Sequence, residues 1–261
     1  MKNQDVNQTF WEHLDVLRGA LIQIASIAAI VSVVAFCFKE ALFQVVLAPK
    51  QNDFITYEWL NRIAVGMGAA PTSFSIELIN TSLAQQFLIH MKTALFAGLL
   101  GASPYALYQL IRFITPALYT EERKPVYRVI GWGYTLFLVG LLIGYFLIFP
   151  LTFRFLGTYQ VSSEVENLIS LDSYITTMMG MCMVLGLIFE LPILSWLLGR
   201  FGLLTPDRMR HFRRHAIVCI LLIAALITPT SDIFTLTIVS LPMWMLYELS
   251  IVVVAKSAAR R

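Results

Sequence analysis

Charged residues are scarce in this chain. Only 13% of its 261 residues are Asp, Glu, Lys or Arg, whereas 58% are hydrophobic. Soluble domains carry about 25% charged residues, so the composition excludes an ordinary water-soluble globular protein. The formal net charge of +3 is too small and too dispersed for a nucleic-acid-binding surface. The composition therefore indicates an integral membrane protein that is surrounded by a lipid bilayer and has no nucleic-acid partner.

Cysteine is scarce as well, and the motifs of several enzyme classes are missing. Cys37, Cys182 and Cys219 lie within apolar runs, at spacings that form neither a disulfide framework nor a zinc site. His211 and His215 are four residues apart, but several arginines and only one acid lie near them, so a metal site is not expected. The sequence contains no P-loop, GxSxG or HExxH motif. We therefore expect no enzyme: no catalytic residue, no cofactor and no bound metal.

Residues 1–18 lack the pattern of a cleavable signal peptide. They contain Asp5, Glu12, Asp15 and Arg18 before any apolar run, whereas such a signal begins with basic residues and a short apolar core. We expect the first apolar segment to be retained. Residues 10–18 instead predict the start of an amphipathic helix at a membrane surface.

Long apolar runs follow along the whole chain. Since about 20 apolar residues span the hydrocarbon core of a bilayer, they predict six transmembrane helices in an all-α protein. The fifth is short, roughly 20 Å at 1.5 Å per residue. The mixed segment 39–84 predicts an external loop with a short helix near 40–47. With no internal repeat and no linker, residues 1–261 are expected to form a single membrane domain. The predicted spans are residues 19–38, 84–111, 126–156, 174–198, 216–228 and 233–255.

The distribution of lysine and arginine predicts the orientation of these spans. The N-terminus, the second and fourth loops and the C-terminal tail carry 14 of the 19 basic residues. Four lie on the opposite side, and Lys92 lies within a span. Because cytoplasmic loops carry the excess of Lys and Arg, both termini are expected in the cytoplasm.

Three ionisable residues, Lys92, Glu190 and Glu248, lie within the predicted spans. A charge at the centre of a membrane helix costs roughly 2.5–3.5 kcal/mol on insertion scales. Lys92 can extend its side chain to the surface, and Glu248 is close enough to the cytoplasmic end to reach the headgroups. Glu190 is followed by Pro192, which removes a backbone hydrogen bond, so we expect a kink and a polar site there.

These three residues also suggest an alternative function. They are the residues that a proton- or ion-coupled secondary transporter would use as a relay. Many such transporters consist of two related halves with broken helices in matching places, and this chain shows no such symmetry.

The loop after the second span carries a compact charged patch. Glu121, Glu122, Arg123 and Lys124 follow one another between two long apolar runs. Such a loop can hold a charged peptide at the membrane surface. Alternatively, the two cations only orient the protein, while the two acids are solvated.

Five segments of the chain resemble the TatC family, the large polytopic subunit of the twin-arginine protein translocase. They occur in the family's order and at its spacing, over about residues 10–255. The segments are HLDVLR (residues 13–18, family HLxELR), PYALYQLIRFITPALYTEER (104–123, family P…YQxWxFxxPgLyxxER), LGLIFELPI (185–193, family GxxFExP), TPTSD (228–232, family TPPD) and LPMWMLYE (241–248, family P…LYE).

This resemblance implies a cupped bundle of six helices in the bacterial inner membrane and a receptor that is not an enzyme. Its partners would be Arg-Arg signal peptides of folded cargo, TatA- and TatB-type single-span proteins and other copies of itself, and the proton gradient would drive export. The signal peptide would contact Glu122 and Phe113, together with Glu121, Asp15, Glu12, Arg18 and Gln109. Glu190 would contact the small partners, with Lys92, Thr228 and Glu248 as further intramembrane polar residues and with Pro49 and Asp232 in the external loops.

The recognition chemistry fits two acids, because the planar fork of arginine meets a carboxylate through two hydrogen bonds. However, the family's N-terminal Glu is Val16 here. Asp15 is one position earlier, which rotates it by about 100° on a helix, so Glu12, Asp15 and Glu121 all remain candidates for the second acid. TPTSD is one residue longer than TPPD, and Leu236 replaces a polar residue, so an intramembrane polar cluster would depend on Thr228 and Thr235.

Overall fold

A computed structural model of the chain describes residues 10–68, 74, 76–114, 126–160, 162, 167–228 and 233–258. The chain divides into two compact units. The first unit comprises Met1–Lys39 and His90–Tyr134, and the second comprises Glu40–Ile89 and Thr135–Arg261. Three helices, α2 (Lys39–Leu47), α4 (Gln85–Ile114) and α5 (Val126–Ile143), have residues in both units.

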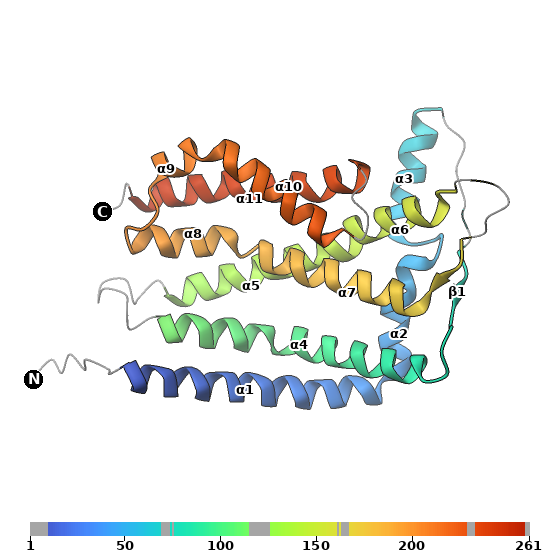
Figure 1. The fold of residues 1–261 in the computed structure, drawn as a ribbon, viewed down its shortest axis with the longest axis horizontal. Coiled ribbons are helices and arrows are strands. Elements are labelled where there is room, and N and C mark those ends of the chain that lie inside the picture. The colour runs from blue at the N-terminus through green and yellow to red at the C-terminus, as the bar shows by residue number, and fades with distance from the viewer. Residues whose placement is uncertain are drawn as a thin grey trace, which may run out of the picture. The chain divides into compact units, whose positions relative to one another are not determined.

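The first unit is built on two long helices, α1 (Phe10–Cys37) and α4 (Gln85–Ile114), which lie side by side (Figure 1). Glycines on α4 allow the close approach. A Cβ at Gly98 would collide with the Ser32 hydroxyl and the Ala28 carbonyl, and one at Gly101 would lie 2.8 Å from the Val31 side chain. Small residues are the usual means by which membrane helices pack without a hydrophobic driving force between them.

The second unit contains the broken spans. α5 (Val126–Ile143) continues through a π-helical segment, η4 (Gly144–Ile148), into α6 (Phe149–Thr158). α7 (Leu171–Ile188) is followed by α8 (Leu191–Arg200). The break falls where it was predicted, because Pro192 lacks an N–H group and cannot continue the hydrogen-bond ladder of α7.

Gly140 and Gly144, four residues apart on the third span, form a close helix contact, as small residues commonly do in membrane proteins. A Cβ at Gly140 would lie 2.6 Å from the Leu185 carbonyl oxygen, and one at Gly144 would lie 3.0 Å from the Cys182 Cα. Both glycines therefore face α7, whose backbone packs directly against them.

The C-terminal part of the second unit is a bundle around α11 (Ile233–Ala258). α8, α9 (Pro206–His211) and α10 (Arg213–Ile227) all pack against α11 (Figure 1). The hydroxyl of Thr205 caps the start of α9 by accepting from the Arg208 N–H. Met209, Ile251 and Val254 form a buried cluster between α9 and α11.

The described residues between 39 and 84 contain more regular structure than the sequence predicted. The expected short helix is α2 (Lys39–Leu47), which leads into a 3₁₀ turn, η1 (Ala48–Lys50). A further helix, α3 (Ile55–Gly66), was not predicted. The strand β1 (Leu78–Ile79) pairs in parallel with β2 (Ile169–Ser170), so that Leu78 is opposite Ile169.

Tyr57 of α3 anchors this segment to the rest of the second unit. Its side chain is 1% exposed, and its hydroxyl lies within hydrogen-bond distance of the carbonyls of Pro49, at 2.9 Å, and Pro150, at 3.0 Å. Thr56 beside it donates to the Phe146 carbonyl. Burial raises the pKa of Tyr57, so its hydroxyl keeps the proton that it donates.

Within the described part of the chain, five helical stretches are long and apolar enough to span a membrane: Leu14–Cys37, Gln85–Phe113, Val129–Thr158, Leu171–Arg200 and Ile233–Ser257. They correspond to five of the predicted spans. The remaining prediction, at residues 216–228, corresponds to α10. With 15 residues, α10 is about 22 Å long at 1.5 Å per residue, which is short of the ~30 Å hydrocarbon core.

Candidate functional site

Several of the predicted contact residues cannot be placed. Glu121 and Glu122 belong to residues 115–125, and Asp232 belongs to residues 229–232, so all three lie outside the described residues. Glu12 lies in the first turn of α1, but its side chain is not among those described. The structure does describe the end of α4, which precedes the charged loop, and the α1 residues Asp15 and Arg18.

α1 and α4 run antiparallel in a fixed register. Val31 lies next to Gly101, and eight residues earlier on α1, Gln23 contacts Gln109, which is eight residues later on α4. Continuing in this register, Arg18 comes level with the last residue of α4, which is Ile114. Asp15 lies about one turn farther along α1. The exposed side chains of Asp15 and Arg18 therefore lie at the level where the charged loop leaves α4.

A hydrogen-bonded triad links α1 to α4 just below this level. The Gln109 amide nitrogen donates to Gln23 Oε1 at 2.6 Å and contacts the Tyr105 hydroxyl at 2.5 Å. The Tyr105 hydroxyl donates to the same Gln23 oxygen at 2.6 Å. Gln109 is 7% exposed, whereas Gln23 is exposed.

The triad reaches toward the charged loop along α4. Phe113 is four residues after Gln109, one helical turn on, so both lie on the same face of α4. The triad thus places amide groups, which can both donate and accept, one turn from an aromatic ring at the mouth of the loop. Gln109 was predicted through the resemblance alone, and Gln23 and Tyr105 were missed. The sequence feature that could have identified Gln23 is the presence of a polar amide side chain within the apolar run 19–38.

Glu190 lies in the second unit at the break between α7 and α8. Its side chain is 8% exposed, and within the described part of the chain its Oε1 has no hydrogen-bond partner. Its backbone carbonyl accepts from the N–H groups of Ile193 and Leu194, both at 3.0 Å. A buried carboxyl group without a partner is costly, which makes this position suited to a polar group supplied from outside the chain.

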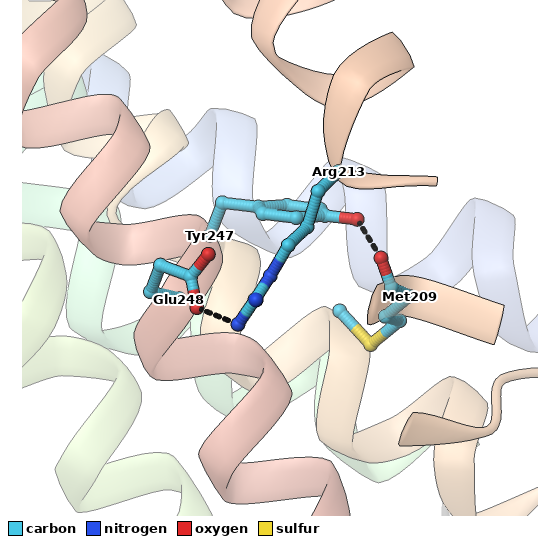
Figure 2. Close-up of polar contacts among 4 residues, drawn as sticks. All are labelled: Met209, Arg213, Tyr247 and Glu248. Carbon is cyan, nitrogen blue, oxygen red and sulfur yellow. Dashed lines mark hydrogen bonds and ion pairs between the residues drawn. The ribbon is translucent and has the colours of Figure 1, made fainter. Parts of the chain in front are cut away.

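Glu248 has a different environment, which Figure 2 shows. Its carboxylate accepts a hydrogen bond from Arg213, the first residue of α10, at 2.6 Å. The neighbouring Tyr247 donates through its hydroxyl to the Met209 carbonyl of α9 at 2.8 Å. Two successive residues of α11 therefore bind the end of α9, through Tyr247, and the start of α10, through Glu248. The sequence did not predict Arg213 or Tyr247 as partners, because 35 and 38 residues separate the members of the two pairs.

The remaining predicted residues have mainly structural contacts or exposed positions. Thr228 is buried at the end of α10, and its hydroxyl donates to the Ala224 carbonyl at 3.1 Å. Lys92 is exposed on α4. Pro49 is buried in η1, and its carbonyl accepts from Tyr57.

Comparison with known proteins decides the family. The family model described as "Sec-independent protein translocase protein (TatC)" matches residues 12–242. The chain belongs to the TatC family. It is 32% identical over 257 residues to the TatC protein of Blattabacterium sp. subsp. Periplaneta americana, covering 96% of each chain. It is also 32% identical to the TatC protein of Aquifex aeolicus, covering 92% of each.

Solved structures agree with this assignment. A crystal structure of the twin-arginine translocase receptor TatC is 31% identical, covers 95% of this chain and 100% of its own, and superposes with a TM-score of 0.74. The chain is therefore an all-α, multi-pass membrane protein with six transmembrane helices and a subunit of the twin-arginine translocase. The short α10 is the sixth apolar helix, in addition to the five longer ones.

Proposed function

We propose that this chain is the receptor subunit of the translocase and binds the Arg-Arg signal peptides of folded proteins at the cytoplasmic face of the bacterial inner membrane. Both termini lie in the cytoplasm. TatA- and TatB-type single-span proteins and further copies of this chain complete the transport unit. The proton gradient drives passage, and the chain itself catalyses no chemical reaction.

The observation that supports this function most strongly is the antiparallel register of α1 and α4. It brings the acidic start of α1, with Asp15, level with the end of α4, from which the loop with Glu121 and Glu122 departs. Two carboxylates close together match two consecutive guanidinium groups, each of which forms paired hydrogen bonds with one carboxylate. Glu122 is the first acid in this proposal, and Asp15, Glu12 and Glu121 are the candidates for the second.

The Gln23–Tyr105–Gln109 triad supports a path for the rest of the signal peptide. Its three hydrogen bonds use the oxygen of Gln23 and the nitrogen of Gln109. Within the triad, the Gln23 nitrogen and the Gln109 oxygen are therefore not engaged. A peptide backbone that leaves the charged loop along α1 can use these two atoms for its own N–H and C=O groups, which otherwise lose their partners in lipid.

Glu190 is the proposed contact for the single-span partners. Unlike Glu248, which pairs with Arg213, its buried Oε1 has no partner in the described part of the chain. A polar side chain or a free backbone group of a partner helix would complete its hydrogen bonding, and such contacts are the usual means by which helices associate within a bilayer.

Cross-linking of a labelled Arg-Arg signal peptide tests the receptor function. In membranes that contain the full chain, we expect the peptide to cross-link to this chain and Glu122→Ala to abolish the cross-link. Glu58→Ala is the matched control, because Glu58 is an exposed acid of α3 in the second unit that pairs with Arg62 at 3.7 Å and is not among the proposed contact residues. Unchanged cross-linking in Glu122→Ala would contradict the proposal.

A further inference from the structure

A cavity of about 310 Å³ lies in the second unit, between the end of α6, the strand β2 and the start of α7. The rings of Phe149, Phe153 and Tyr174 form one wall, with Tyr174 edge-on to both phenylalanines at centroid distances of 5.0 and 4.9 Å. Among the residues that the structure describes, none of the side chains that line the cavity is charged. The cavity therefore suits an uncharged, mainly apolar ligand.

Polar contacts hold the wall and the rim of the cavity in place. The Tyr174 hydroxyl donates to the Val46 carbonyl at 3.1 Å. Asn167, at the rim, donates through its amide to the carbonyls of Gly157, at 3.2 Å, and Tyr159, at 2.7 Å. The hydroxyl of Ser170 accepts from the Ser173 N–H at 3.2 Å and caps α7. These contacts keep the cavity open, as is usual for preformed ligand sites.

One polar atom in the lining has an unmet hydrogen bond. The side chain of Thr152 is 1% exposed, and its hydroxyl has no partner among the residues that the structure describes. Threonines in helices commonly donate to the carbonyl four residues earlier, as Thr158 and Thr237 do at 2.7 Å. The carbonyl four residues before Thr152 belongs to Ile148, the last residue of the π-helical segment η4. Thr152 does not make this bond, and its side chain lines the cavity.

The position of the cavity indicates its depth in the bilayer. Its lining comes from the last turns of the Val129–Thr158 span and the first turns of the Leu171–Arg200 span. The ends of membrane spans lie near the boundary between hydrocarbon and headgroups. At that depth, a phospholipid presents uncharged ester carbonyls joined directly to its acyl chains.

We propose that this cavity binds the ester end of one acyl chain of a phospholipid. The ester carbonyl accepts a hydrogen bond from the Thr152 hydroxyl, and the first methylene groups pack against the three aromatic rings. The volume is sufficient for about ten groups of water size at roughly 30 Å³ each, which is a chain segment and not a whole lipid. This site is separate from the proposed signal-peptide surface of the first unit and does not depend on it.

The test uses the full chain in nanodiscs that contain a phospholipid with a photoactivatable diazirine near the ester end of one acyl chain. After irradiation, mass spectrometry maps the labelled residues. We expect label on the lining residues of α6 and α7. Thr152→Val keeps the shape but removes the hydroxyl, and it should lower this label between about two- and tenfold, as the loss of one hydrogen bond does.

Two further variants make the result decisive. Ser173→Phe places a ring at the exposed mouth of the cavity and should remove the label, whereas Thr237→Val, on α11 and outside the cavity, should leave it unchanged. Each variant is first shown to be monodisperse and to keep its thermal unfolding transition.

A free fatty acid with the same diazirine separates the two possible sources of an acyl chain. Because the described lining residues include no cation for a carboxylate, the free fatty acid should label the cavity less than the phospholipid does. Label that is spread evenly over lipid-facing helices, that survives Ser173→Phe, or that is equal for the free fatty acid would overturn the proposal.

Discussion

The hydrogen bonds between α1 and α4 give a prediction that follows directly from the geometry of the first unit. Gln109→Leu keeps the approximate size of the side chain but removes the nitrogen that contacts Gln23 Oε1 at 2.6 Å and the Tyr105 hydroxyl at 2.5 Å. Gln23→Leu removes the oxygen that accepts from both partners. Each substitution therefore breaks the direct link between the two glutamines and leaves the close packing at Gly98 and Gly101 intact.

The expected magnitude comes from hydrogen bonds between membrane helices, which contribute about 0.6 kcal/mol on average and about 1.7 kcal/mol at most. Gln109 is buried and both distances are short, so we expect a coupling energy between Gln23 and Gln109 in the upper half of that range, about 1–1.7 kcal/mol. The same Gln23 oxygen accepts from both Gln109 and Tyr105, so the effect of either glutamine substitution depends on the other residue. The loss should therefore appear as coupling and not as two independent effects.

A double-mutant cycle measures this coupling. The free energy of unfolding is determined in detergent micelles for the parent chain, Gln23→Leu, Gln109→Leu and the double variant. The double variant should be more stable than the sum of the two single effects predicts, by the coupling energy. Effects that add within about 0.3–0.5 kcal/mol, as they do for independent sites, would refute the triad as a link between the helices.

Two further predictions concern the second unit. Gly140→Val should destabilise the chain by about 1–3 kcal/mol, as overpacking does, because a Cβ there would lie 2.6 Å from the Leu185 carbonyl oxygen and 2.8 Å from Phe189. Gly131→Val is the control, since nothing lies within 4 Å of a Cβ at that helical position, and equal thermal unfolding of the two variants would argue against the contact. Glu248→Gln should lower stability by about 1 kcal/mol or less, because the pair with Arg213 is partly exposed and such pairs contribute little. The exchange Arg213→Glu with Glu248→Arg should recover most of what Arg213→Glu alone loses, and no recovery in thermal unfolding would show that the pair does not hold α10 to α11.

The sequence predicted those features that depend on the chemistry of consecutive residues. Apolar runs indicated the spans, because the bilayer requires about 20 apolar residues for each. Pro192 predicted the break at Glu190, because a proline cannot donate the missing hydrogen bond. Small residues four apart, such as Gly140 and Gly144, favour a close helix contact, but the sequence does not show that α7 is the partner.

Features that depend on contacts between distant segments were missed. α3 lies in a segment of mixed composition, and its burial depends on Tyr57 reaching Pro150, which is 93 residues away. The strands β1 and β2 have two residues each, too few for an alternating pattern. Gln23 looks like an isolated polar residue in the sequence and Arg213 like one of several basic residues, and only the folded chain shows which residues they contact.

The affinity of the purified chain for signal peptides that differ only in their paired basic residues tests the central claim most directly. If two carboxylates at the start of α1 and in the loop after α4 each form paired hydrogen bonds with a guanidinium group, a Lys-Lys peptide should bind about tenfold more weakly or worse than its Arg-Arg parent, because an ammonium group cannot reproduce that geometry. Equal dissociation constants for the two peptides would contradict the account.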